Sequence, residues 1–231
     1  MADLDEIPRK KCITTNTSVN YWSRRYSIFS KFDEGIWLTD DAWFGVTPEP
    51  IANKIAEHIA EASPADRSIL IDAFGGAGGN TIAFAKSGRW KQIYSIEKDP
   101  VVLKCAKHNA KIYGVAHLIT WFEGDCFQVL KNELKDLAQT SVIFASPPWG
   151  GPQYRKKKVL DLRTMEPYSL DTLMKEYSLF TKEIVLFLPR TSNINQIAKY
   201  VPDGKKATVM HYCEEGLSKA MCVYYGAFKP L

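Results

Sequence analysis

The chain has 231 residues, 45% hydrophobic and 24% charged, which is ordinary for one globular domain with a small appendage. It has no signal-peptide pattern and no apolar run of about eighteen residues, so neither a secreted nor a membrane-spanning protein is expected. Five widely spaced cysteines without a Cys-x-x-Cys pair predict a reducing compartment and no bound metal. The net charge of +4 permits an anionic partner without requiring one.

The amino-terminal part of the chain divides into a tail and an aromatic segment. Residues 1–17 are polar and without periodicity, which predicts a disordered tail, and their cluster Arg9-Lys10-Lys11 fits either solvated charge or part of a nuclear address. From Ser18, a candidate N-cap, near-helical spacing predicts a short helix with the aromatic residues Tyr21, Trp22, Tyr26, Phe29 and Phe32. This aromatic face could dock on the main domain or form one wall of a substrate pocket.

A second helix is predicted after the aromatic pair Trp43-Phe44, which could be core or ligand wall. Thr47 can cap this helix and Pro48 suits its first position, and the apolar spacing carries it to about Ala62. We therefore expect a helical and aromatic extension over residues 18–63 and the main domain over residues 64–231.

The main domain reads as alternating strands and helices. Five apolar strands are predicted at 68–74, 92–97, 117–122, 141–145 and 184–188, with intervening helices at 81–87, 99–113, 126–137 and 170–180. A helix at 193–200 and two closing strands at 207–212 and 220–228, close enough to pair antiparallel, complete the chain. The predicted fold class is α/β: a mainly parallel, Rossmann-like, seven-stranded sheet with an antiparallel C-terminal hairpin and ligands at the strand carboxyl ends.

One loop stands out chemically, Ala145-Ser146-Pro147-Pro148-Trp149-Gly150-Gly151. Two prolines stop the preceding strand, since neither can donate to a ladder. The loop offers the Ser146 hydroxyl, backbone carbonyl oxygens and the Trp149 ring, a combination that suits a planar base with an exocyclic amine. A tight turn with a core tryptophan is the alternative.

A glycine loop, residues 75–79, follows the first strand, and three carboxylates lie at successive strand ends: Asp72, Glu97 and Asp125. The loop lacks the third glycine of the dinucleotide pattern, which argues against a pyrophosphate. S-adenosylmethionine fits these charges, with its ammonium by Asp72, its ribose on Glu97 and its adenine amine on Asp125. Each carboxylate could instead be a cap, a solvated strand end or a turn residue.

These motifs resemble those of a known family. Asp72-Ala73-Phe74-Gly75-Gly76-Ala77-Gly78 is similar to motif I of class I methyltransferases, and Ser146-Pro147-Pro148-Trp149 to the loop of those that methylate exocyclic amines. With residues 43–49 and Phe187-Leu188-Pro189-Arg190, the chain resembles the trimethylguanosine synthases, the RNA cap hypermethylases. Their second loop position is often Cys, and Gly75 here is expected to loosen the loop.

The resemblance implies transfer of two methyl groups to N2 of a 7-methylguanosine cap on small nuclear and nucleolar RNAs. It implies S-adenosyl-L-methionine as cofactor, a nuclear or nucleolar location, and small ribonucleoprotein proteins as candidate partners. The expected catalytic residues are Ser146, Pro147 and Trp149. Expected cofactor-binding residues are Thr47, Asp72, Phe74, Gly76, Gly78, Asn80, Thr81, Glu97, Asp125 and Cys126. Expected substrate-binding residues are Lys31, Trp43, Phe44, Glu49, Asn109, Trp149, Tyr154 and Arg190.

Two alternatives stay open at this point. The chain could methylate an internal RNA guanine or adenine amine, or it could be a non-catalytic RNA-binding adaptor on the same fold. The basic run Arg155 to Lys158 could contact a triphosphate or simply be a solvated loop.

Overall fold

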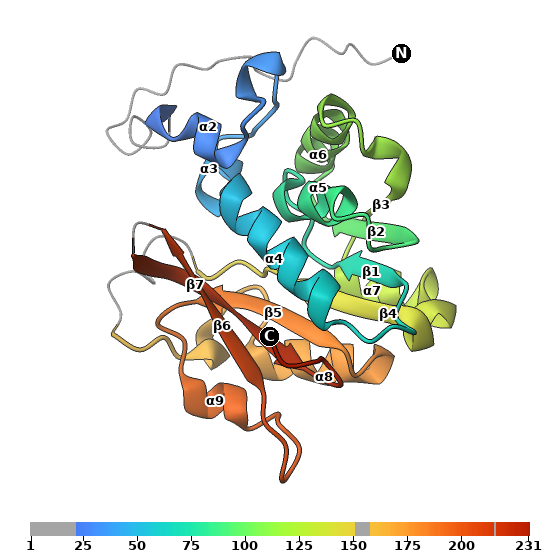
Figure 1. Ribbon diagram of the computed structural model, residues 1–231, viewed down its shortest axis with the longest axis vertical. Helices are drawn as coiled ribbons and strands as arrows, with labels where there is room; N and C mark the ends of the chain where they lie inside the picture. Colours follow the sequence, from blue (N-terminus) through green and yellow to red (C-terminus); the bar gives the residue numbers. More distant parts are fainter. Residues whose placement is uncertain (1–21, 151–157, 215) are drawn as a thin grey trace.

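The computed structural model describes residues 22–150, 158–214 and 216–231. Its centre is a seven-stranded sheet in the order β3-β2-β1-β4-β5-β7-β6 (Figure 1). The first five strands are parallel, β7 is antiparallel to β5, and β6 is antiparallel to β7. The strands are β1 (Ile69–Asp72), β2 (Gln92–Glu97), β3 (Ile119–Glu123), β4 (Ser141–Ala145), β5 (Ile184–Pro189), β6 (Thr208–Glu214) and β7 (Leu217–Tyr225). The predicted fold class, including the antiparallel C-terminal hairpin, is confirmed.

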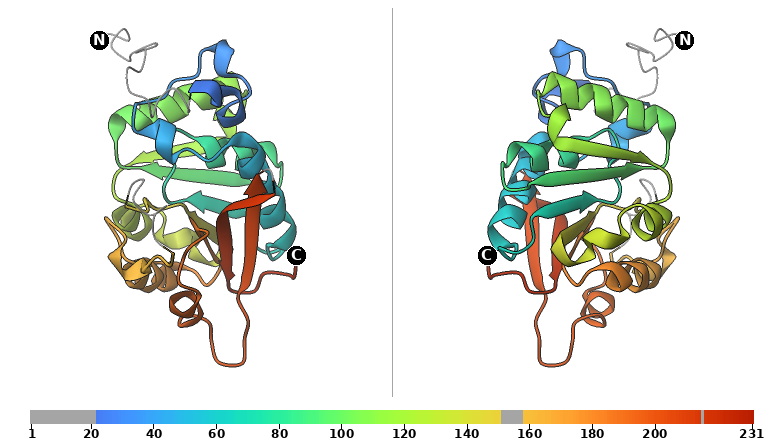
Figure 2. Two further views of the ribbon diagram at one scale, coloured as in Figure 1. Left: turned by 90° about the vertical axis from the view of Figure 1, so that its left-hand side faces the viewer. Right: turned by 90° about the vertical axis from the view of Figure 1, so that its right-hand side faces the viewer.

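Helices cover both faces of this sheet (Figures 1 and 2). They are α4 (Glu49–Ala62), α5 (Gly79–Lys86) and α6 (Pro100–Ile112) on one face, and α7 (Cys126–Asn132), α8 (Leu170–Phe180) and α9 (Ile194–Ala198) on the other. Alternation along β5 shows the two faces: Val185 and Phe187 join the first core, and Ile184, Leu186 and Leu188 join the second. Short 3-10 turns lie at 116–118, 135–140 and 162–164.

Local sequence explains where several helices begin and end. The Asp99 carboxylate accepts from the amides of Val101 and Val102, and Pro100 occupies the first turn of α6. Gly114, with φ of 74°, follows the helix in the left-handed region, as its position in the sequence predicted. Thr47 does not cap α4; its hydroxyl accepts instead from the Asn80 side chain, at 3.0 Å.

The aromatic segment is less regular than its spacing predicted. Its candidate cap Ser18 and Tyr21 lie outside the described residues, and one continuous helix to Phe32 is wrong. A four-residue helix α2 (Arg25–Ile28) ends at Phe29, whose backbone is extended, and a 3-10 turn (Phe32–Glu34) and α3 (Ala42–Gly45) follow. The apolar residues Ile28 and Phe29 are nevertheless buried against the main domain.

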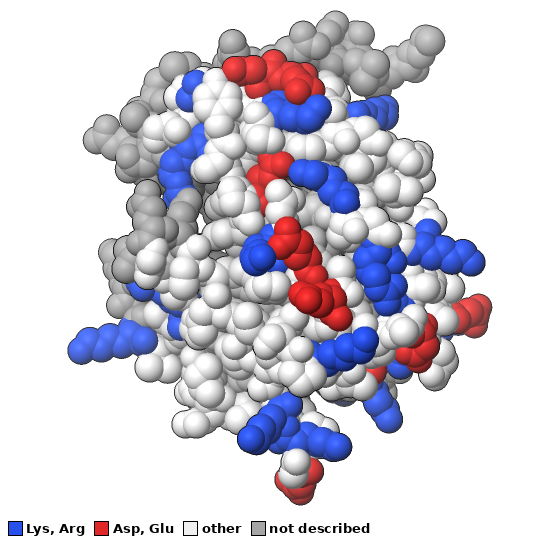
Figure 3. All heavy atoms as spheres, in the orientation of Figure 1, with Lys and Arg blue, Asp and Glu red and all other residues white. Residues whose placement is uncertain are grey.

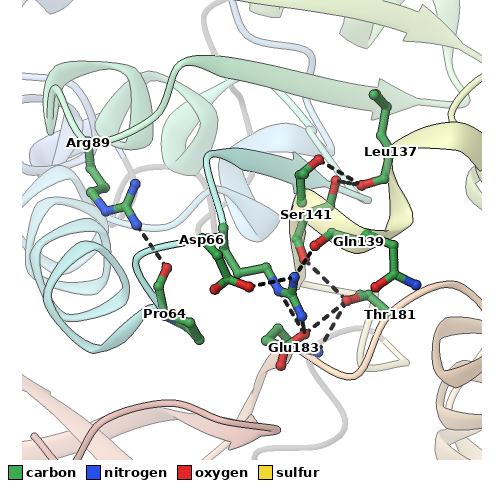
Figure 4. Close-up of polar contacts among 10 residues, drawn as sticks. Pro64, Asp66, Arg89, Leu137, Gln139, Ser141, Thr181 and Glu183 are labelled. Atoms are coloured by element: carbon green, nitrogen blue, oxygen red, sulfur yellow. Dashed lines mark hydrogen bonds and ion pairs between the residues drawn. The ribbon is translucent and has the colours of Figure 1, made fainter.

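An ion pair ties the loop before β1 to the start of β5, at the sheet edge opposite the strand carboxyl ends (Figure 4). Arg67 contacts Oε2 of Glu183 through Nε at 3.0 Å and Nη2 at 2.9 Å, with 16% and 5% of the two side chains exposed. The guanidinium also donates to the Gln139 carbonyl, and the Thr181 hydroxyl donates to Glu183. The network therefore links the beginnings of β1, β4 and β5.

We expect Arg67→Ala to lower the free energy of unfolding by about 3–5 kcal/mol, because Glu183 is left buried without its cation. Urea denaturation measures this loss. Arg163→Ala is the matched control: it removes a guanidinium that is 67% exposed beside Asp161 and should change little. Similar losses of stability in both variants would show that the buried Arg67–Glu183 pair contributes no more than an exposed ion pair.

Candidate active site

A cavity of about 720 Å³ opens at the carboxyl ends of the parallel strands. It is lined by the glycine loop after β1, the residues at the ends of β2 and β3, the Pro-Pro loop after β4, residues 39–47, and Pro167 and Tyr168. We call residues 36–47 the wall segment. This volume lies within the range of small-molecule sites, about 300–1,000 Å³. The described residues that line it and belong to the predicted site are Phe44, Thr47, Phe74, Gly76, Asn80, Glu97, Asp125, Cys126, Ser146, Pro147 and Trp149.

The glycine loop is held tightly from behind. Gly76 and Gly78 have φ of 51° and 94°, which only glycine adopts without strain. A Cβ at Gly75 would lie 2.2 Å from the Ser95 hydroxyl oxygen, so that hydroxyl fills the space of a side chain. The Gly75 amide also donates to the Ile96 carbonyl at 2.8 Å. These contacts argue against the loosening expected from glycine at this position.

Glu97 and Asp125 both line the cavity and both also organise backbone. Glu97 accepts from the Gly76 amide at 2.9 Å through Oε2 and from the Asp99 amide at 2.8 Å through Oε1. Asp125 caps α7 through Oδ1, while Oδ2 accepts the hydroxyl of Tyr168. Since an ionised carboxylate has about four acceptor positions, each retains capacity for a ligand hydroxyl or amine.

Asp72 lies behind the loop and does not line the cavity. Its side chain is fully buried and accepts from the Thr81 hydroxyl at 2.6 Å and from the Phe74 amide at 3.3 Å. Burial raises the pKa of Asp72 to about 7 against these hydrogen bonds. Thr81 is equally buried, and Gly78 packs on Ala106. Both were expected to contact the cofactor, but neither lines the cavity. These three residues support the loop from behind.

Asn80 presents the polar atom that the expected ammonium contact needs. It lines the cavity with 8% of its surface exposed, and its amide nitrogen donates to the Thr47 hydroxyl. Its carbonyl oxygen, Oδ1, is buried without a hydrogen-bond partner. Because a buried unpaired acceptor is costly, this atom indicates a site for a ligand donor.

The Pro-Pro loop extends beyond the last paired residue of β4, Ala145, and places Ser146 to Trp149 along the cavity. The indole nitrogen of Trp149 donates to the Phe187 carbonyl at 3.3 Å, and its ring lies 5.5 Å from that of Phe187. Trp149 is half-buried and packs against both cores. It is therefore both anchored to β5 and available to the cavity.

Of the two aromatic residues before α4, one belongs to the core and the other to the wall of the cavity. Trp43 is only 7% exposed and packs against Phe32 and Trp22, with ring centroids 5.5 and 6.1 Å away. Phe44 is 41% exposed and lines the cavity. Trp43 is thus a core residue, and Phe44 belongs to the wall.

Two expected substrate residues instead fasten the wall segment and its neighbours to the main domain. Asn109 is fully buried and bonds to the backbone of Trp37 and Ala77. Partial burial opposes ionisation of Glu49, but hydrogen bonds from Tyr113, the Ser30 amide and Lys86 lower its pKa. Neither residue is among those lining the cavity.

The expected triphosphate cations are less well placed. Lys31 pairs with Glu34 at 3.0 Å, away from the cavity, and Arg190 is exposed just after β5. Tyr154 and the run Arg155 to Lys157 lie outside the described residues. On the face drawn in Figure 3, lysine and arginine side chains are scattered rather than gathered in one patch. Lys98, not expected from the sequence, lines the cavity.

Other residues that line the cavity were also missed. Tyr168 contributes through its bond to Asp125 and its ring, 6.4 Å from that of Phe74. It lies 43 residues from Asp125 in an irregular segment, so no periodicity could place it. Thr39 and Asp41 of the wall segment could have been found only from their nearness to Phe44.

Comparison with known proteins decides the family. A family model described as RNA cap guanine-N2 methyltransferase matches residues 67–228. The chain belongs to this family. Trimethylguanosine synthase of Schizosaccharomyces pombe is 39% identical over 228 residues, 96% of this chain and 93% of that protein. Its Saccharomyces cerevisiae counterpart is 31% identical over 230 residues, 97% of this chain and 72% of that protein.

Solved structures support the fold of this family member. A putative methyltransferase from Porphyromonas gingivalis W83 superposes with a TM-score of 0.67 at 18% identity, covering 93% of this chain and 50% of that one. Within the described ranges, no helix has the length and apolar character needed to cross a bilayer. The same ranges hold no cluster of three or more His, Cys, Asp or Glu residues arranged as metal ligands.

The buried carboxyl group of Asp72 should make stability depend on pH. Its pKa in the folded state exceeds the unfolded value of about 4, so the folded state holds the proton more tightly. The free energy of unfolding should therefore fall by up to about 4 kcal/mol as the pH rises from about 4 to 7. The stability of Asp72→Asn relative to wild type should accordingly increase between pH 4 and 7 and stay level above. Urea titrations across pH, with the exposed Asp203→Asn as control, measure this; a flat difference would contradict it.

Removal of the unpaired acceptor should weaken cofactor binding. Asn80→Ala is expected to lower affinity for S-adenosylhomocysteine roughly tenfold to a hundredfold, the value of a hydrogen bond to a charged group. Calorimetric titration measures the loss. Thr47→Val, which removes the partner of the Asn80 amide nitrogen but leaves Oδ1, should lose less. Equal affinity in Asn80→Ala and wild type would remove this residue from the cofactor site.

Proposed function

We propose that this enzyme transfers methyl groups from S-adenosylmethionine to the exocyclic N2 of a 7-methylguanosine RNA cap, giving the 2,2,7-trimethylguanosine cap. The observation that carries the proposal is a single cavity, which brings the glycine loop, Glu97 and Asp125 together with the Ser-Pro-Pro-Trp loop. The family model and the two trimethylguanosine synthases, which the chain matches over nearly its whole length, agree with this reaction.

The cavity residues fit the cofactor group by group. Asn80 Oδ1, unpaired and buried, suits the ammonium group, whereas Asp72 does not line the cavity. Glu97 can accept the ribose hydroxyls, and Asp125 retains an acceptor position for the adenine amine. Phe74 and Tyr168 add apolar and aromatic surface. When bound, S-adenosylmethionine supplies a methyl group activated by its sulfonium.

The Pro-Pro loop can prepare the guanine amine. The lone pair of guanine N2 is delocalised into the ring, so a transition state with a pyramidal nitrogen must be favoured. The Ser146 hydroxyl and the backbone carbonyls of Ser146 and Pro147 lie beyond the end of the β4 ladder and can accept the hydrogens of this amine. Once N2 has taken the methyl group from sulfur, leaving S-adenosylhomocysteine, the methylated nitrogen is strongly acidic and loses a proton to solvent, so no strong base is required. Positioning and electrostatic stabilisation of this kind then account for most of the acceleration.

Trp149 suits the charge of the cap base. A guanine methylated at N7 is cationic, and a tryptophan face attracts a cation by about 0.5–2 kcal/mol. The bond from the indole nitrogen to Phe187 fixes the ring before the base arrives. Phe44 lines the same cavity from the wall segment. For the triphosphate, the candidates among the described residues are Lys98 at the cavity and the exposed Lys158 and Arg190.

The wider biological setting is also a proposal. Small nuclear and nucleolar RNAs are the proposed substrates, with proteins of their ribonucleoprotein particles as partners and the nucleus, or nucleolus, as the location. The resemblance in the sequence supports this setting, and the cluster Arg9-Lys10-Lys11 is compatible with nuclear import. Methylation of an internal RNA amine is less favoured, since it gives no reason for a wall segment that encloses the base.

Labelled methyl transfer tests the reaction itself. The enzyme is incubated with S-adenosylmethionine carrying a radioactive methyl group and, separately, with GTP, 7-methyl-GTP and uncapped RNA. Label in 7-methyl-GTP alone, released as N2-methylated 7-methylguanine, is the expected result. Label in uncapped RNA but not in 7-methyl-GTP would overturn the proposal in favour of an internal amine.

Substitution of Trp149 should reduce discrimination for the methylated base. We expect the affinity ratio of 7-methyl-GTP to GTP to fall in the order Trp149, Trp149→Phe, Trp149→Ala, because stacking area and cation attraction decrease together. Fluorescence or calorimetric titration measures the ratio, with melting temperatures recorded alongside.

Trp121→Ala is the matched control, because Trp121 is also half-buried against the first core and does not line the cavity. It should lower stability and leave the ratio unchanged. If Trp149→Ala behaves in the same way as this control, Trp149 is a core residue rather than a base platform.

A further inference from the structure

Helix α6 lies between the glycine loop and the wall segment and contacts both. Towards the loop, Ala106 packs against Gly78, where a Cβ would lie 3.4 Å from Ala106. On its other side, the His108 ring stacks on the Trp37 ring of the wall segment with centroids 3.7 Å apart, and His108 Nε2 lies 2.8 Å from the carbonyl oxygen of Gly35, just before that segment. Two of the segments that line the cavity are thus both in contact with one helix.

Asn109 of α6 bonds to both segments through a single side chain. Its oxygen accepts from the Trp37 amide at 2.8 Å, and its amide nitrogen donates to the Trp37 carbonyl at 2.9 Å. The same nitrogen donates to the carbonyl of Ala77, a residue of the glycine loop that lines the cavity, at 3.0 Å. The side chain is fully buried, so water cannot replace these bonds.

We propose that Asn109 is a positioning residue that couples cofactor binding to cap binding, an inference that rests on the function proposed above. A cofactor against Ala77 and Gly76 restricts the glycine loop. Through Asn109 that restriction reaches Trp37 and the wall segment beyond it, which contributes Phe44 to the base site. The second ligand then binds to a wall already ordered, which raises its affinity.

The chemistry of asparagine suits this role. Only a side chain with a donor and an acceptor on one planar group can bond the amide and the carbonyl of the same residue and still reach a third backbone group. A second link runs parallel to it, from Thr47 of the wall segment to Asn80 at the start of α5. The bond to Thr47 holds the carboxyl-terminal end of the wall segment, and the bonds from Asn109 hold the end near Trp37.

Calorimetry with S-adenosylhomocysteine and 7-methyl-GTP, each titrated alone and in the presence of the other, measures the coupling. In wild type we expect each ligand to raise the affinity of the other by about fivefold or more, and by the same factor in both orders. In Asn109→Ala this factor should fall to near one. Asn109→Asp keeps the acceptor for the Trp37 amide but loses both donated bonds, and it should also lose most of the factor.

Cys105→Ala is the matched control, since Cys105 is fully buried on the same helix one turn earlier and bonds neither segment in the described structure. It should lower the melting temperature and keep the wild-type factor. In steady-state assays, Asn109→Asp should raise the KM for 7-methyl-GTP at saturating cofactor more than it lowers kcat.

The outcomes separate this inference from the proposed function. If wild type binds both ligands with no mutual effect, or if both Asn109 variants keep the wild-type factor, the coupling role is wrong while the function stands. If wild type binds S-adenosylhomocysteine but not 7-methyl-GTP, the proposed cap substrate itself is wrong. Should Asn109→Ala not fold, the factor measured for Asn109→Asp decides.

Discussion

The site depends on one constraint, the parallel alignment of β1 with both of its neighbours. Asp72 at the end of β1 is in register with Ser95 of β2 and Phe144 of β4, so the loops after the three strands leave the sheet at the same edge. Because β3 extends the same parallel order, Asp125 reaches that edge too. The residues that would hold a cofactor therefore lie beside those that would hold a base, because both sets follow strands that end at this edge. The wall segment, which contacts α6, lines the same cavity.

Within this edge, similar side chains have different tasks because their burial differs. Asp72 is enclosed and supports the loop through Thr81, while Glu97 and Asp125 organise backbone amides and still face the cavity. Asn80, the second residue of α5, carries the unpaired acceptor. Asp72 does not line the cavity, whereas the unpaired oxygen of Asn80 belongs to a residue that does, so Asn80 is the better placed of the two to accept from an ammonium group.

Much of this could be predicted from the sequence. Continuous apolar runs predicted β1, β4 and β5, and the alternation of strands and helices predicted a mainly parallel sheet. The positions of Glu97, Asp125 and Trp149 at the cavity followed from the strand ends and the Pro-Pro loop. Three features did not follow. The sequence does not show that Asp72 is buried behind the loop while Asn80 lines the cavity, or that Trp43 packs in the core while Phe44 is exposed. Tyr168 lies in an irregular segment whose position depends on contacts with residues distant in sequence. The aromatic spacing also predicted one helix, although Phe29 adopts an extended backbone and ends it.

The central claim is that one cavity holds the cap base on Trp149 with its amine beside Ser146, opposite a cofactor on the glycine loop. A crystal structure of the enzyme with S-adenosylhomocysteine and 7-methyl-GTP tests it most directly. The account predicts the 7-methylguanine ring parallel to the Trp149 indole, N2 within hydrogen-bond reach of Ser146 or the Pro147 carbonyl, and the cofactor amine on Asn80. A guanine bound away from Trp149, with N2 facing solvent, would contradict it.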